Sequence, residues 1–260
     1  MSNTQLTTKQ FFQREDVKSK FTELLGTRTN QFMTSLLSIV NNNSYLKNAS
    51  PESIYTSAMM AAALDLPINP NLSFAYLVPY GSACQFQLGW RGYVQLALRT
   101  GQFKTVSVTP IYEGQLIENN PLTGYKFDFN VKASDKVIGY CSYFSLINGF
   151  EKYLYMTVDE ITAHGKKYSK TFGNGVWKND FNAMAQKTCL KLLLSKYAPM
   201  SIELQKAYIA DQSVIKNVGN SIEDMEVEYV DNGQDVSIKI EEVTQNATAR
   251  IDKLKNKTND

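Results

Sequence analysis

The segment "KVIGYCSYFSLINGFEKYLYMTV", residues 136–158, decides the fold class. Aromatic and β-branched residues alternate with small or polar ones on both sides of Asn148-Gly149. An Asn-Gly pair between two such runs is a strong signal for a β-hairpin, because both residues tolerate the positive φ that tight turns require. Further strand-like runs lie upstream, at residues 103–117 and 124–130. The sequence therefore predicts a mainly antiparallel β region here.

Helical patterns follow this region. Residues 157–169 begin a helix, with Thr157 or Asp159 near its cap. Residues 170–180 contain two glycines and read as a loop. A long helix over residues 179–197 comes next, so helices are expected to lie against the predicted strands.

The N-terminal side has the same mixed character. Two helices are predicted within residues 29–66, and the second has Ser50 as its cap and Pro51 at its first helical position. Residues 74–89 read as a second hairpin. Residues 88–101, "LGWRGYVQLALRTG", then form a helix that stops at its last glycine. The predicted class is α+β, an antiparallel sheet flanked by helices.

Charge is distributed unevenly along the chain. Residues 1–210 carry 21 Lys and Arg against 14 Asp and Glu, whereas residues 211–260 carry 6 against 11. A basic body suggests an anionic ligand, although many soluble domains reach a similar excess without binding nucleic acid. We expect three parts: an N-terminal arm (1–28), a core (29–215) that holds the ligand site and the contacts between subunits, and an acidic tail (216–260) that is mostly disordered or forms a small partner-binding helix.

Composition excludes several protein classes. Hydrophobic residues make up 43% and aromatic residues 12% of the chain, which is enough for a real core. No apolar run is long enough to span a bilayer, and the polar N-terminus lacks the apolar segment of a signal peptide. The expected location is therefore the cytoplasm, and three widely separated cysteines are expected to be free thiols.

The residues needed for common enzyme chemistry are missing. The sequence has no phosphate-binding G-x-x-x-x-G-K-[ST] loop, no C-x-x-C pair and one histidine, His164. Acidic residues could support Mg²⁺-dependent nuclease chemistry, but helix-start positions account for most of them better. The candidates are Asp128, Asp159, Glu160 and Asp180. We expect no catalytic residues, no metal site and no cofactor, with Mg²⁺ acting at most by screening the charge of an anionic ligand.

Two basic stripes are the positive evidence for a nucleic-acid ligand. On the helix of residues 88–101, Arg91, Gln95 and Arg99 recur every four residues, with Gly92 beside them. Guanidinium groups suit phosphates, and a glycine would let a sugar–phosphate backbone approach closely. A merely solvated face is the alternative.

The second stripe lies on the long helix and the segment before it. Lys187 and Lys191 are four residues apart, and basic residues alternate with aromatic ones upstream. Such a mixture suits single-stranded nucleic acid, because cations follow the backbone and rings stack on bases. The aromatic residues could equally belong to the core, and apolar residues near the lysines suggest burial on more than one face, as at a subunit interface. The remaining candidate contacts are Lys104, Lys166, Lys167, Lys170, Trp177 and Lys178.

Two blocks of sequence resemble the RecT family of phage single-strand annealing proteins. The first block runs from "ALDLPINPNLSFAYLVPYG" through "CQFQLGWRGYVQLALRTGQFKTVSVTPIYEGQLI", residues 63–117. The second is "WKNDFNAMAQKTCLKLLLSKYAP", residues 177–199. Residues 89–92 fall on the glycine-flanked turn of the family, and Trp177, Met184 and Lys187 fall on its C-terminal core helix.

The resemblance implies a fold and an activity. The fold is a RecT/Redβ-like annealing core with β-β-β-α order that forms a basic groove. The activity is ATP-independent annealing in phage-type homologous recombination: the protein binds single-stranded DNA as a ring or helical filament, promotes pairing with the complementary strand, and holds the new duplex. Implied partners are DNA, further copies of the chain, a 5′–3′ exonuclease and the host single-strand binding protein, in a bacterial cytoplasm.

Two alternatives remain at this point. A structural or interaction protein with a solvated basic face would not bind an oligonucleotide in a salt-sensitive manner. A Mg²⁺-dependent nuclease would degrade DNA, whereas an annealing protein would leave the strands intact.

Overall fold

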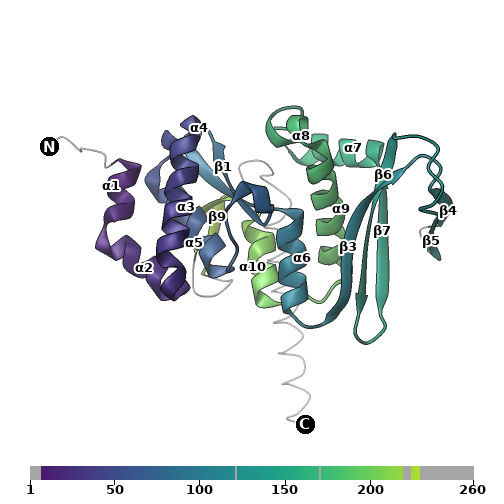
Figure 1. Cartoon of the computed structure of the whole chain (residues 1–260), viewed down its shortest axis with the longest axis horizontal. Helices are drawn as coiled ribbons and strands as arrows, with labels where there is room; N and C mark the ends of the chain where they lie inside the picture. The colour runs from purple at the N-terminus through teal and green to yellow at the C-terminus, as the bar shows by residue number, and fades with distance from the viewer. Residues whose placement is uncertain (1–6, 121, 170, 219–223, 229–260) are drawn as a thin grey trace, which may run out of the picture.

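The computed structural model describes residues 7–120, 122–169, 171–218 and 224–228. The chain contains both helices and strands, and the helices cover antiparallel sheets, which confirms the predicted α+β class (Figure 1). Within the described residues, no helix is both long and apolar enough to cross a membrane.

The N-terminal part is helical. Its helices are α1 (Thr8–Gln13), α2 (Glu15–Leu25), α3 (Thr29–Asn42), α4 (Ser44–Lys47) and α5 (Pro51–Ala63). As predicted, the Ser50 hydroxyl accepts a hydrogen bond from the Ser53 amide at 3.1 Å and Pro51 opens α5. Capping thus starts α5 where the sequence indicates.

Residues 8–25 differ from the expected N-terminal arm. Phe11, Phe12 and Phe21 are buried in the largest hydrophobic cluster of the protein. The Phe21 ring meets the Tyr55 ring of α5 edge-on, with centroids 5.7 Å apart. Burial of three phenylalanine rings stabilises this docking strongly, so α1 and α2 are part of the core.

The first hairpin leads directly into the helix that carries Arg91. Strands β1 (Ala75–Tyr80) and β2 (Ala83–Leu88) pair antiparallel around Gly81, whose φ is +56°, and α6 (Trp90–Arg99) follows. The hairpin and the helix were both predicted. Strand β2 packs on α5, where the Ser57 hydroxyl donates to the Cys84 carbonyl.

A three-stranded sheet forms the other part of the molecule. Its strands are β3 (Phe103–Tyr112), β6 (Val137–Leu146) and β7 (Glu151–Thr157), in the order β3-β6-β7 and antiparallel throughout. The predicted turn at Asn148-Gly149 joins β6 to β7, and Gly149 has a φ of +88°. A small separate hairpin of β4 (Leu116–Asn120) and β5 (Gly124–Phe127) interrupts the chain between β3 and β6.

One face of this sheet is covered by the long helix α9 (Phe181–Tyr197). The Ser142 hydroxyl of β6 donates to the Cys189 carbonyl of α9 at 3.1 Å. Helices α7 (Val158–Tyr168) and α8 (Gly175–Asn179) connect β7 to α9. Three strands followed by a helix across them give the β-β-β-α order that the resemblance implies.

The described C-terminal elements fold back onto the N-terminal part. They are α10 (Ile202–Ala210), β8 (Val214–Asn217) and β9 (Glu226–Glu228). Val214 and Ile215 are buried, and β8 packs on α5 and β2. The expected acidic tail, residues 216–260, lies mostly outside the described residues, and its role stays a prediction.

Candidate nucleic-acid interface

Arg91 is presented to solvent by the first turn of α6. Helix α6 buries Tyr93, Leu96 and Ala97, so Arg91 points away from the core and is exposed. The guanidinium lies over the ring of its neighbour Trp90, 5.3 Å from the centroid. No carboxylate pairs with Arg91 in the part of the chain that the structure describes, which leaves its donors available for an anion.

Gly92 has a different role from the predicted one. It is buried, and a Cβ at this position would lie 2.3 Å from the Phe74 carbonyl oxygen and 2.7 Å from a Leu88 methyl group. The backbone that approaches Gly92 closely is therefore the protein's own, and the prediction that it faces a DNA backbone is corrected. Glycine is needed here because α6 packs tightly against the segment before β1.

Arg99 is bonded to the protein's own backbone, although its side chain is 37% exposed. Its guanidinium donates to the Leu64 carbonyl at 2.6 Å and to the Asp65 carbonyl at 2.7 Å, both at the C-terminal end of α5. These carbonyls have no partner within their own helix, so a cation there satisfies them and the helix dipole. The predicted stripe of Arg91, Gln95 and Arg99 is thus not one open surface: Gln95 is half-buried and Arg99 ties α6 to α5.

Three further exposed cations lie on α7 and α8. Lys166 and Lys167 occupy the last turn of α7, where Lys167 covers the Tyr168 ring at 4.8 Å, and Lys178 lies on α8. Helices α6, α7 and α8 all pack on α9, which supports all of these side chains. We refer to Arg91, Lys166, Lys167 and Lys178 as the basic rim.

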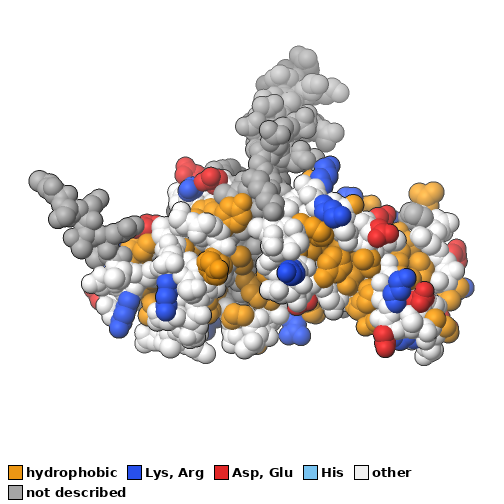
Figure 2. Space-filling model, turned by 90° about the horizontal axis from the view of Figure 1, so that it is seen from above, with side chains coloured by type: hydrophobic (Ala, Val, Ile, Leu, Met, Phe, Trp, Pro, Cys, Tyr) orange, Lys and Arg blue, Asp and Glu red, His pale blue; other side chains and the backbone are white. Residues whose placement is uncertain are grey.

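Lys166, Lys167 and Lys178 belong to helices at the upper side of the molecule, whereas Arg91 belongs to α6, which lies lower in the same view (Figure 1). Helices α7 and α8 and the start of α9 lie along this side in Figure 1. Seen from above, Lys and Arg side chains are spread over the surface in separate groups, with an apolar area between some of them (Figure 2). Separate cations beside apolar area suit an extended strand better than a single compact anion.

Trp177 is a core residue. Only 6% of it is exposed, and its ring contacts Phe172 and Phe181 at centroid distances of 5.2 and 5.8 Å. In this position the ring anchors α8 to α9 and has no open face for a nucleobase, which resolves the alternative that the sequence left open. Its indole N–H has no acceptor among the described residues. Lys170 lies outside the described residues.

Lys104 lies far from the basic rim. It is exposed at the start of β3, next to the end of the sheet that carries the β6–β7 turn, because Phe103 pairs with Leu146. Helix α7 starts at the opposite end, after Thr157. At roughly 3.3 Å per residue, the eight or nine residues between these ends span about 25–30 Å.

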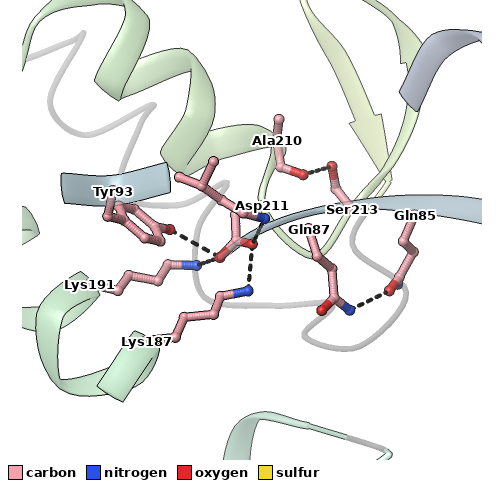
Figure 3. A network of polar contacts seen from close by, with 9 residues as sticks. Gln85, Gln87, Tyr93, Lys187, Lys191, Ala210, Asp211 and Ser213 are labelled. Carbon is pink, nitrogen blue, oxygen red and sulfur yellow. Dashed lines mark hydrogen bonds and ion pairs between the residues drawn. The ribbon is translucent and has the colours of Figure 1, made fainter. Parts of the chain in front are cut away.

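Lys187 and Lys191 both bind Asp211 (Figure 3). The Lys187 Nζ donates to Oδ1 and the Lys191 Nζ to Oδ2, each at 2.7 Å. Lys187 is only 4% exposed, so the prediction that it lies on an open basic stripe is wrong, and Lys191 is largely covered. The reason is that α9 is enclosed by the sheet, α6 and the C-terminal segment of the same chain.

The pKa of Asp211 reflects this environment. Burial alone would raise the pKa of the carboxyl, but the two ammonium groups outweigh burial and hold it at about 2. Burial also lowers the pKa of Lys187, and Asp211 opposes that shift. One buried carboxylate between two lysines therefore stays ionised and leaves one positive charge unmatched in this cluster.

Asp211 was missed from the sequence. The available signal was a pair of lysines four residues apart on a helix that is otherwise apolar on most sides. Such a pair requires a buried anion, since buried ammonium groups are paired in folded proteins. The sequence around Lys187 does not identify which carboxylate provides this anion, because Asp211 is 24 residues away.

Two of the acidic residues considered for nuclease chemistry, Glu160 and Asp180, take part in helix caps. Glu160 forms a capping box with Thr157 at the start of α7, and the Asp180 carboxylate accepts from the Ala183 amide at 3.0 Å at the start of α9. These cap positions were predicted. Among the described residues, no group of three or more His, Cys, Asp or Glu side chains is arranged to hold a metal ion.

Comparisons with known proteins give the same assignment as the resemblance. The sequence model of the RecT family matches residues 30–229. The chain is 48% identical to the uncharacterized protein YqaK of Bacillus subtilis (strain 168), over 83% of this chain and 75% of that protein. It is 26% identical to protein RecT of Escherichia coli (strain K12), over 73% of this chain and 75% of that protein. The chain therefore belongs to the RecT family of phage-type recombination and strand-annealing proteins.

Proposed function

We propose that this protein binds single-stranded DNA along its basic rim and promotes pairing with the complementary strand without ATP. Membership of the RecT family supports the annealing activity. The observation that carries the DNA site is that all four cations of the basic rim, Arg91, Lys166, Lys167 and Lys178, are exposed. Phosphates are the anions such cations bind best.

The binding energy would be mainly electrostatic. Each phosphate that meets a Lys or Arg releases a condensed counterion, so the affinity falls as salt rises, with a logarithmic slope of about 0.7 per neutralised phosphate on a single strand. Such contacts hold the backbone and do not read the bases. Watson–Crick pairing with the second strand then supplies the specificity of the reaction.

A fixed support for the rim favours pairing. Helices α6, α7 and α8 pack on α9, which in turn lies on the three-stranded sheet. Cations held in this way can keep a strand extended, and a complementary strand can test the exposed bases before it is held as duplex. Lys104 on β3 would extend the path along the sheet, and Lys191 would contribute long-range potential from inside.

Assembly into a homo-oligomer, a ring or a helical filament, fits this mechanism. A few cations in one subunit give modest affinity, and copies aligned along one strand add their contributions because later contacts become intramolecular. We further propose a 5′–3′ exonuclease and the host single-strand binding protein as partners, with the acidic tail as the candidate contact. These partners follow from the family resemblance.

The test compares rim variants with a matched control. Arg91→Ala and Lys178→Ala are expected to weaken binding of a labelled oligonucleotide and to slow annealing, and each should reduce the salt slope by about 0.7. Lys9→Ala is the control, since Lys9 is an exposed lysine on α1. Absence of salt-sensitive binding by the unmodified protein would contradict the proposal, and degraded strands in Mg²⁺ would indicate a nuclease.

A further inference from the structure

The Asp211 carboxylate accepts four hydrogen bonds. Besides the ammonium groups of Lys187 and Lys191, its donors are the Leu88 amide at 2.9 Å on Oδ1 and the Tyr93 hydroxyl at 3.0 Å on Oδ2. Asp211 is 2% exposed and Tyr93 is 1% exposed. Each oxygen thus accepts one ammonium and one uncharged donor, which uses both carboxylate oxygens fully.

Two of these donors bracket the turn that carries Arg91. Leu88 is the last residue of β2, and Gly89 then serves as the N-cap of α6 without a side-chain cap. Tyr93 lies one turn into the helix. Asp211 therefore holds the chain three residues before Arg91 and two residues after it.

The other two donors come from the helix that supports the rest of the basic rim. Lys187 and Lys191 lie on consecutive turns of α9, on which α7 and α8 pack. A single carboxylate consequently joins the first turn of α6 to α9, as the convergence of Tyr93, Lys187 and Lys191 on Asp211 shows (Figure 3). Hydrogen bonds between charged groups are stronger than those between neutral groups, so this connection between α6 and α9 is rigid.

We propose that Asp211 is a positioning residue for DNA binding: it fixes the first turn of α6 against α9 and so sets the place of Arg91 relative to the other rim cations. This inference rests on the proposed function. Asp211 does not touch DNA in this role, since its oxygens are filled and its charge repels phosphate. It acts through the Leu88 amide and the Tyr93 hydroxyl.

The first test is a double-mutant cycle between Tyr93→Phe and Arg91→Ala, with oligonucleotide Kd as the readout. Tyr93→Phe removes one bond to Asp211 and keeps the ring in the core. It is expected to weaken DNA binding about three- to tenfold, the effect of one hydrogen bond. In the Arg91→Ala background the same change should have little further effect, because the side chain that it misplaces is absent.

A purely structural role gives a different result. In that case Tyr93→Phe lowers the melting temperature, while its effect on Kd, measured well below that temperature, is absent or adds fully to the effect of Arg91→Ala. Either outcome overturns the inference, and so does an Arg91→Ala variant with unchanged affinity. Failure of the unmodified protein to bind DNA is a separate result that contradicts the proposed function itself.

A triple variant separates stability from positioning. Asp211→Leu with Lys187→Met and Lys191→Met replaces the buried charges with apolar side chains of similar size, a change that is often neutral or stabilising. The control is Lys187→Met with Lys191→Met in the presence of Asp211, and both variants are compared at a temperature where circular dichroism shows them folded, because the control leaves a buried carboxylate without a counter-charge. We expect the triple variant to be folded yet to bind DNA more weakly than this control, because the Leu88 amide and Tyr93 hydroxyl have lost their acceptor. Equal affinity of the two variants would overturn the inference.

Discussion

Lys187 and Asp211 form an ion pair inside the protein, with 2.7 Å between Nζ and Oδ1 and almost no exposure of either side chain. Two helices that are separate in sequence, α9 and α10, are joined at this point, and Lys191 adds a second ammonium group. Because the pair is buried, its loss should affect the protein far more than the loss of a surface pair.

Replacement of Asp211 by Asn is therefore predicted to be strongly destabilising. The amide keeps the size of the side chain but leaves the buried Lys187 and the partly exposed Lys191 without a counter-charge. The expected loss in free energy of unfolding is about 3–5 kcal/mol. Urea unfolding followed by circular dichroism measures it. Glu228→Gln, which breaks the exposed pair with Lys216, is the control and should cost less than about 1 kcal/mol. Equal losses for the two variants would contradict the buried pair.

The pH dependence of stability is predicted to contain a contribution from Asp211. Its pKa is about 2 in the folded protein against 3.8 as the ordinary value, so the unfolded chain binds its proton first as the pH falls. The stabilisation is fully present above pH 3.8 and is lost between 3.8 and about 2. Unfolding midpoints in urea at pH 5, 4, 3 and 2 would show this loss of stability. Over this range the unmodified protein should lose stability relative to the triple variant, which lacks Asp211, and a constant difference between the two would contradict the assignment.

Local chemistry explains which parts of the fold could be predicted. The turn at Asn148-Gly149 and the caps at Ser50, Thr157 and Asp180 depend on residues within three or four positions, and all of them occur where the sequence places them. Alternation and helical periodicity likewise concern neighbours. The α+β class and the hairpins followed from these features.

The candidate site was harder to predict because the exposure of each of its side chains depends on residues that are distant in sequence. Helical spacing correctly places Arg91 and Arg99 two turns apart, but it does not reveal that Arg99 binds carbonyls 34 and 35 residues away. Gly92 contacts Phe74, and Lys187 meets Asp211, across separations that are shorter but still far longer than one helical turn. Residues that recur at helical spacing therefore identify one face of a helix. Tertiary packing decides whether that face meets solvent.

Gly92→Ala is predicted to destabilise the protein although alanine is the better helix former. The new Cβ would lie 2.3 Å from the Phe74 carbonyl oxygen, and that backbone atom cannot move without shifting the segment that leads into β1. Overpacking of this kind costs about 1–3 kcal/mol, which exceeds the gain in helix propensity. Gln95→Ala on the same helix is the control. Thermal unfolding compares the two, and a Gly92→Ala variant as stable as Gln95→Ala would disprove the tight contact.

Arg91→Ala and Arg99→Ala are predicted to have opposite effects. Arg91 is exposed and has no bonded carboxylate among the described residues, so its removal should leave the melting temperature nearly unchanged and reduce both DNA affinity and its salt slope. Arg99 donates to two carbonyls at the end of α5, so its removal should cost about 1–3 kcal/mol of stability and leave the salt slope as it is. Melting curves and oligonucleotide titrations at several salt concentrations measure both properties in each variant. If Arg99→Ala reduced the slope as much as Arg91→Ala, the whole stripe would have to face DNA, as the helical spacing alone suggests, and α6 would have to detach from α5 when the strand binds.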